Sequence, residues 1–417
     1  MTASDDSPTS ETRSDPGGEL AAAGETAPTE QTTPTDRGDD LKPGEADDGV
    51  TEPAEKHFVQ PPRASLQRNV SAMMSSQLFT WVLATVLSVL IPRYVGPEVQ
   101  GQLTLAGSLF NIGAIFVVLG TGQYLRLEIA RQPQEGLSQI GTVLVMRTTA
   151  FVPIALLIGI YASVVRPERQ FALILLIMGV TALLTTWGDV VGSSFIGLER
   201  MSIVAIVGAL SKLLLTVGVV VVIVLDAGVY AVLGVGVLTA AWALLQLLWR
   251  YRHIGPIILR GWTRRALPIL RASIPFMAVG LALVLYQQID VIVISSVVDD
   301  EVLGWYGTSD TLFGSLLFPA TIIAGTIFPT LGRLYQNDPD AMVDLVKRTF
   351  RALILVGVPI GLGVVIVAPE FAPLLYGEEF RETGAVLAVT GPVVVLTFGT
   401  ILFGTVALAT ERATTWV

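Results

Sequence analysis

The sequence predicts an all-α polytopic membrane protein, and three observations support this fold class. Hydrophobic residues make up 52% of the 417 residues and charged residues 15%, whereas soluble domains carry about 25% charged residues. From Ser65 onward, the apolar stretches reach about 20 residues, which suffices for a helix to cross a hydrocarbon core roughly 30 Å thick. These stretches do not alternate apolar with polar residues, as the strands of a membrane β-barrel would.

We expect ten membrane helices, because ten stretches meet this length. With the N-terminus in the cytoplasm, 17 Lys and Arg residues fall in cytoplasmic segments, against four in outer loops (Arg93, Arg166, Arg169 and Arg381). The positive-inside rule therefore predicts a multi-pass plasma-membrane protein with a cytoplasmic N-terminus. The expected helices are 69–92, 99–123, 137–161, 170–197, 202–225, 228–249, 272–297, 302–328, 350–368 and 383–409.

An internal repeat predicts how these helices are grouped. Glu98-Val99-Gln100-Gly101 follows the first helix, and Glu301-Val302-Leu303-Gly304 follows the seventh, 203 positions later. Both helices start on the same side, so the repeats are parallel. We expect a six-helix bundle at 64–250, a basic cytoplasmic linker at 251–271 that lies on the inner leaflet, and a second bundle at 272–417. That second bundle has four of an expected six helices, which indicates a chain that is incomplete at its C-terminal side.

The first 63 residues have a different composition from the rest. They hold 15 of the 35 acidic residues and 5 of the 26 basic residues, and they are rich in Thr, Pro and Gly. This composition predicts a disordered acidic cytoplasmic tail. In the remainder the charges nearly balance, so the chain has no basic footprint for nucleic acid. There is no Cys, and no enzyme, metal or cofactor motif appears, so we expect no cofactor.

Five ionisable residues fall inside the expected helices. A charge at the centre of a membrane costs about 2.5–3.5 kcal/mol on insertion scales, so such residues are expected to pair, to line water or to serve function. Gln287 lies one turn before one of them, Asp290, on the same helical face. Asn111 belongs to a stripe of small and polar residues that fits either a cavity wall or close helix packing. The five residues are Arg147, Asp189, Lys212, Asp290 and Asp310.

Three segments resemble those of a known family. The segment Ile91-Pro92-Arg93-Tyr94-Val95-Gly96-Pro97-Glu98-Val99-Gln100-Gly101 resembles the "aRyLGpeeyG" segment of polysaccharide and oligosaccharide-lipid flippases. The stretch from Gly120 to Arg131 resembles another segment of that family. So do Ser273-Ile274-Pro275-Phe276, Gln288-Ile289-Asp290 and Gly304-Trp305-Tyr306 taken together. The resemblance covers residues 65–417 and implies a superfamily that also contains multidrug and toxin extrusion transporters and the lipid II flippase.

The resemblance implies a transporter and not an enzyme. It implies that a lipid-linked oligosaccharide or polysaccharide precursor moves from the cytoplasmic to the outer leaflet by alternating access between two bundles. Membrane lipids and the lipid-linked glycan are the expected partners, and a monovalent cation is a candidate coupling ion. Three alternatives stay open: a multidrug extruder of the same superfamily, a membrane-embedded glycosyltransferase that uses Asp299 and Asp300, and an inactive fragment.

For the charged residues, this function suggests specific roles. We expect Arg147 and Lys212 to face a central cavity and to bind a lipid phosphate, Arg through a two-pronged contact and Lys as a point charge. The alternative is that they pair with Asp189 or another acid, or extend toward the nearer interface. Asp290 and Asp310 are further cavity candidates. Arg93, at the outer mouth, is either a headgroup contact or a structural anchor.

Overall fold

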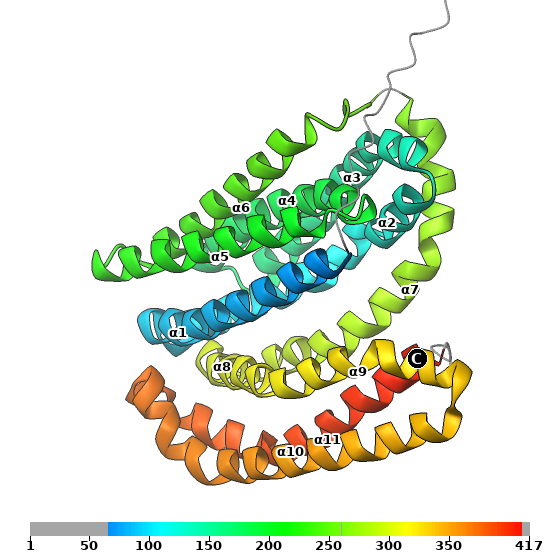
Figure 1. The fold of residues 1–417 in the computed structure, drawn as a ribbon. Coiled ribbons are helices and arrows are strands. Elements are labelled where there is room, and N and C mark those ends of the chain that lie inside the picture. Colours follow the sequence, from blue (N-terminus) through cyan, green and yellow to red (C-terminus); the bar gives the residue numbers. More distant parts are fainter. Residues whose placement is uncertain (1–65, 260, 411–417) are drawn as a thin grey trace, which may run out of the picture. The chain divides into compact units, whose positions relative to one another are not determined.

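The computed structural model describes residues 66–259 and 261–410, and every regular element within them is helical (Figure 1). This confirms the all-α fold class. The predicted acidic tail at 1–63 lies outside the described residues. The helices are α1 (Leu66–Val118), α2 (Thr121–Arg131), α3 (Pro133–Val165), α4 (Arg169–Gly197), α5 (Met201–Val224), α6 (Val229–Tyr251), α7 (Trp262–Ser295), α8 (Asp300–Leu316), α9 (Phe318–Asn337), α10 (Pro339–Tyr376), the short 3₁₀ helix η1 (Glu378–Phe380) and α11 (Arg381–Ala409).

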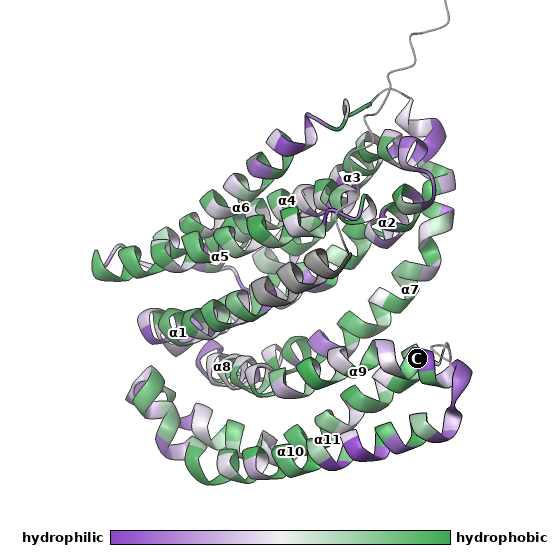
Figure 2. Cartoon of the chain, viewed as in Figure 1, coloured by the Kyte–Doolittle hydropathy of each residue, from purple (hydrophilic) through white to green (hydrophobic). Residues whose placement is uncertain are grey.

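Nine helical segments of the described chain are long and apolar enough to cross a membrane. Figure 2 shows hydrophobic residues along the middle of the helices and hydrophilic residues gathered mainly near their ends. The protein is therefore a multi-pass membrane protein. The first of the nine segments belongs to α1 and contains two halves, because Gly96 interrupts the helix with φ 81° and ψ 168°, a conformation that glycine adopts readily.

The two halves of α1 run side by side in opposite directions. Ser88 from the first half and Gly107 from the second line the same cavity. Leu87 packs with Val219 of α5, whereas Leu105 packs with Phe171 of α4. The halves of α1 therefore correspond to the first two expected helices.

Several helices differ in extent from the prediction. The expected helix 302–328 is divided into α8 and α9, and Pro319 lies in the first turn of α9. The expected cytoplasmic segment after the second helix forms α2. In addition, α7 begins at Trp262, ten residues before the predicted start at 272. Hydropathy marks only the part of a helix inside hydrocarbon, and these helices continue into polar surroundings. The linker residues 254–259 form no helix.

The loops that were predicted to lie outside meet at one end of the helices, which we call the Gly96 end. There Arg93 donates hydrogen bonds to the carbonyl oxygens of Leu374 and Leu375, at 3.3 and 2.9 Å. Arg166, between α3 and α4, forms an ion pair with Asp300 at the start of α8, at 2.5 Å. These contacts place the loop after the first half of α1, the α3–α4 loop and the start of α8 on one side, as the alternation predicts.

The segments that were predicted to lie in the cytoplasm, and the helix ends next to them, meet at the opposite end, which we call the Arg126 end. Gly120 lies against the backbone of Ser273 in α7, and Gly141 lies against the backbone of Ile258. Arg265 donates to the carbonyl oxygen of Ser138 at 3.4 Å. The loop alternation therefore matches the prediction.

At the Gly96 end, α1 and α8 approach through two glycines of the repeat. A Cβ on Gly101 would overlap the backbone oxygen of Asp300, and a Cβ on Gly304 would overlap that of Pro97. Residues 97 and 300, like residues 101 and 304, are 203 positions apart, so the two halves of the contact are related by the repeat. The repeat therefore has a structural counterpart. The division at 250 and 271 stays a prediction.

Candidate functional site

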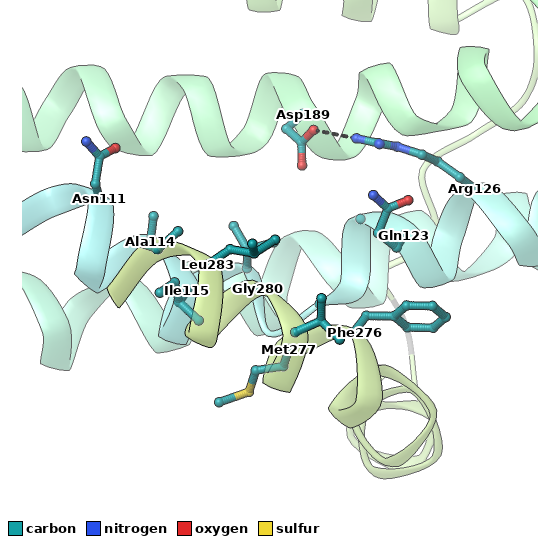
Figure 3. A pocket seen from close by; sticks show the side chains of 15 residues that line it. Asn111, Ala114, Ile115, Gln123, Arg126, Asp189, Phe276, Met277, Gly280 and Leu283 are labelled. Atoms are coloured by element: carbon teal, nitrogen blue, oxygen red, sulfur yellow. Dashed lines mark hydrogen bonds and ion pairs between the residues drawn. The ribbon is translucent and has the colours of Figure 1, made fainter. Parts of the chain in front are cut away.

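A cavity of about 570 Å³ opens between α1, α2, α4 and α7 (Figure 3). Its walls are mainly apolar, and its polar groups come from α1, α2 and α4. We call it the arginine cavity. It is lined by Asn111, Ala114, Ile115, Val118, Gly120, Gly122, Gln123, Arg126, Asp189, Phe276, Met277, Val279, Gly280, Leu283 and Val284.

The charged group of this cavity contains two arginines and one aspartate. Arg147 of α3 forms an ion pair with Asp189 of α4 at 2.8 Å, from Nη1 to Oδ2. Arg126 of α2 contacts the other carboxylate oxygen at 3.3 Å, from Nη2 to Oδ1 (Figure 3). Arg147 also donates from Nε to Thr121 Oγ1 at 3.0 Å and from Nη1 to the carbonyl oxygen of Thr186 at 3.3 Å. The group carries a net charge of one positive unit.

The two arginines have different surroundings. The Arg147 side chain is 0% exposed, whereas those of Arg126 and Asp189 are 32% and 39% exposed. Arg126 lines the cavity and Arg147 does not. Arg147 Nη2 is buried without a hydrogen-bond partner, close to Gly122, where a Cβ would lie 3.1 Å from it. Arg147 therefore pairs with Asp189, the alternative kept open above, and Arg126 is the guanidinium that a bound molecule would reach.

A second cavity of about 540 Å³ adjoins the first, because Asn111 lines both. We call it the central cavity. It lies between the two halves of α1 and helices α4 to α8, and it brings together Lys212, Asp310 and Gln288. Lys212 also lines a third cavity of about 440 Å³ between α4, α5 and α6, together with Asp189. In the described part of the chain, Lys212 forms no ion pair with a carboxylate.

The remaining predicted residues lie elsewhere. Tyr306 of α8 donates a hydrogen bond to Asp290 Oδ2, and the other oxygen, Oδ1, is buried without a partner. Gln287 is exposed and lines neither the arginine cavity nor the central cavity, whereas its neighbour Gln288 lines the central one. Arg93 contacts the last carbonyl groups of α10, as a structural anchor would.

Arg126 is a cavity residue that the sequence did not predict. It was assigned to a cytoplasmic loop, because the second helix was expected to end at 123. In the structure the chain turns at Leu119 and Gly120, both with positive φ, and α2 then places Arg126 beside Asp189. Asp189 was the available signal for this contact, since a carboxylate in a membrane helix requires a partner. Among the described residues, no group of three His, Cys, Asp or Glu could hold a metal ion.

Comparison with known proteins agrees with this fold. Residues 89–385 match the model of a family described as polysaccharide biosynthesis protein. The solved structure of the lipid II flippase MurJ in an inward closed conformation superposes with a TM-score of 0.65 and 11% identity, over 81% of this chain and 76% of that chain. The structure of a Vibrio cholerae MATE transporter superposes with a TM-score of 0.55 and 15% sequence identity, over 84% of each chain. The sequence has no match among curated proteins.

A multidrug resistance MATE family transporter of the MOP superfamily, solved in an outward-facing conformation, gives a TM-score of 0.54 and 16% identity. That alignment covers 84% of this chain and 82% of that chain. At these identities the solved structures establish the shared fold. The family match extends over more than half of the chain, so this protein belongs to the polysaccharide biosynthesis protein family.

Proposed function

We propose that this protein moves a lipid-linked oligosaccharide or polysaccharide precursor across the plasma membrane, from the cytoplasmic to the outer leaflet, by alternating access. The observation that carries the proposal is the positive charge of the arginine cavity, where two guanidinium groups share one carboxylate. A phosphate or pyrophosphate that links a glycan to its lipid has the complementary charge. Arginine binds phosphate oxygens through paired hydrogen bonds, which favours this class of ligand.

In this proposal Arg126 contacts the phosphate, and Arg147 has a supporting role. The buried Arg147 orients Asp189, which in turn holds Arg126 at the cavity wall. Lys212 supplies a second positive charge in the adjoining central cavity. Asn111, Gln123 and Gln288 offer amide donors and acceptors for sugar hydroxyl groups in the two cavities. The lipid chain would remain in the hydrocarbon.

Loading from the cytoplasm agrees with the arrangement of the helices. The Gly96 end is closed by the contact of Gly101 with α8 and by the pair of Arg166 with Asp300. The arginine cavity lies away from this contact and reaches Arg126. The excess of basic residues in the loops of the Arg126 end supports a cytoplasmic position for that end and for the N-terminus.

A cation gradient is a suitable energy source for this movement. About 2.3 kcal/mol is available for each charge that crosses 100 mV. Two carboxylates of the second repeat, Asp290 and Asp310, are the candidate cation ligands or proton carriers. Asp290 has one oxygen that is buried without a partner, and Asp310 faces the central cavity. Neither carboxylate forms an ion pair among the described residues.

The proposal is tested with purified full-length protein in proteoliposomes that contain a fluorescent lipid-linked oligosaccharide diphosphate. Wild type is expected to move the lipid between leaflets, and Arg126→Gln is expected to slow this movement at least tenfold. The matched control is Arg131→Gln, because Arg131 lies on the same helix but outside the cavity. Equal rates for wild type and Arg126→Gln would contradict the proposal. Uptake of a cationic drug without movement of the lipid would favour the multidrug extruder.

A further inference from the structure

A groove of about 460 Å³ runs between α3 and α4, apart from the arginine and central cavities. One wall is formed by α3, from Phe151 to Ser163, and the other by α4, from Arg169 to Leu183. Twelve residues of α3 span about 18 Å at 1.5 Å per residue. One leaflet is half of a hydrocarbon core roughly 30 Å thick. The groove therefore extends over the depth of one leaflet, that of the Gly96 end.

The walls of this groove are apolar and face away from the protein core. Leu176 is 65% exposed, and Val180 is also exposed. The floor is formed by Ala155, Ile158 and Gly179, and a Cβ on Gly179 would lie 3.2 Å from the ring of Phe110. On the α3 side, a Cβ on Gly159 would meet no atom within 4 Å. A hydrocarbon chain fits such a surface, because its methylene groups would cover the exposed apolar side chains.

The polar end of the groove carries three charged side chains, those of Arg166, Glu168 and Arg169. Arg166 is engaged by Asp300 and by the carbonyl oxygen of Ser295. Glu168 accepts a hydrogen bond from Gln102 Nε2 at 3.1 Å. Arg169 is exposed, and in the described part of the chain its side chain has no hydrogen bond or ion pair. The free guanidinium stands at the level where the headgroups of that leaflet lie.

We propose that the α3–α4 groove is a binding site for an anionic phospholipid of the leaflet at the Gly96 end. One acyl chain lies along α3 and α4 past Gly159, and the phosphate contacts Arg169. This site is distinct from the transport cavities and does not depend on the transported substrate. The adjacent Arg166 binds α8, so the lipid borders the loop that links α3 and α4 to the contact at the Gly96 end.

Native mass spectrometry of the delipidated full-length protein tests the site, with phosphatidylglycerol and phosphatidylcholine as probes. Wild type is expected to bind its first phosphatidylglycerol at least fivefold more tightly than phosphatidylcholine, the factor expected for one basic residue near a phosphate. Arg169→Gln is expected to lose this preference without a change in thermal stability, because Arg169 is exposed and unpaired.

The groove itself is tested by Gly159→Trp, which fills it from an open position. The matched control is Gly363→Trp in α10, where a Cβ also meets no atom within 4 Å. Gly159→Trp is expected to abolish the tightest phosphatidylglycerol binding, and Gly363→Trp is expected to retain it. The proposal is overturned if wild type shows no preference, if the two tryptophan variants bind alike, or if only a polyisoprenyl phosphate occupies the groove.

Discussion

The two ends of the helical assembly differ in how α1 meets the second repeat. At the Gly96 end, Gly101 and Gly304 allow the backbones of α1 and α8 to touch, and no side chain lies between them. Farther from the Gly96 end, the two cavities that share Asn111 open beside α1, and Trp81 of α1 stacks on Phe318 of α9 with ring centroids 3.9 Å apart. At the Gly96 end α1 and α8 are therefore joined through their backbones, whereas at the Arg126 end α7 is contacted by Gly120, which borders the arginine cavity.

In the proposed transport cycle, this difference indicates which interactions would break when the cavity opens toward the Gly96 end. Besides the glycine contact, few polar links join helices α1–α6 to helices α7–α11 at the Gly96 end in the described residues: Arg93 to the carbonyl oxygens of Leu374 and Leu375, and Arg166 to Asp300 and to the carbonyl oxygen of Ser295. The exposed links of Arg93 are individually weak, and the mostly buried pair of Arg166 with Asp300 is the stronger contact. Arg147 and Asp189 both lie in the predicted first bundle, 64–250. Their buried ion pair can therefore stay intact when the two bundles move relative to each other.

The largest expected effect concerns the charged group of the arginine cavity. Asp189→Asn leaves the buried Arg147 guanidinium without a counter-charge, so we expect a loss of about 3–5 kcal/mol in the free energy of unfolding. Arg126→Gln removes a partly exposed partner and is expected to cost less than about 1 kcal/mol. Unfolding in mixed micelles by SDS titration measures both. Similar losses for the two variants would show that Arg147 is not held by Asp189.

A smaller effect is expected at the glycine contact. In Gly304→Leu the new side chain meets the backbone of Pro97, so we expect a loss of about 1–3 kcal/mol and separation of α1 from α8. Gly314→Leu, on the same helix, is the control, because a Cβ there meets no atom within 4 Å. The same titration compares the two variants. Equal stability of the two variants would mean that the close contact of Gly304 with Pro97 does not hold α1 and α8 together at the Gly96 end.

The ion pair at the Gly96 end is expected to have a smaller effect on stability than the glycine contact. Arg166→Gln removes the contact with Asp300 and should cost about 1–2 kcal/mol, since both side chains are mostly buried. Labelling of a single cysteine at Gln100, which lines the central cavity, should increase from the side of the Gly96 end. The chain has no native cysteine, so the label reports this position alone. Unchanged labelling in Arg166→Gln would mean that Arg166 does not help to close the Gly96 end. Arg169→Gln is the control variant.

Much of the fold was predictable from the sequence, because membrane helices are marked by long apolar stretches and loop sides by basic residues. The site was predictable only in part. Arg147 and Asp189 are 42 positions apart, and spacing cannot show whether two helices bring such residues together. Gln287 and Gln288 differ by about 100° around a helix, so an error of one residue exchanged an exposed position for a cavity position. The short helix α2 has a mixed polar composition and gives no membrane signal, which concealed Arg126.

The account depends most on the claim that the cavities receive an anionic headgroup from the Arg126 end. Asn111→Cys places a single thiol where the two cavities meet. We predict that a membrane-impermeant maleimide labels this thiol from the side of the Arg126 end. A lipid-linked oligosaccharide diphosphate should slow this labelling at least fivefold in the Asn111→Cys protein, but not in the protein that carries both Asn111→Cys and Arg126→Gln. Labelling only from the Gly96 end, or equal protection in both proteins, would contradict the account.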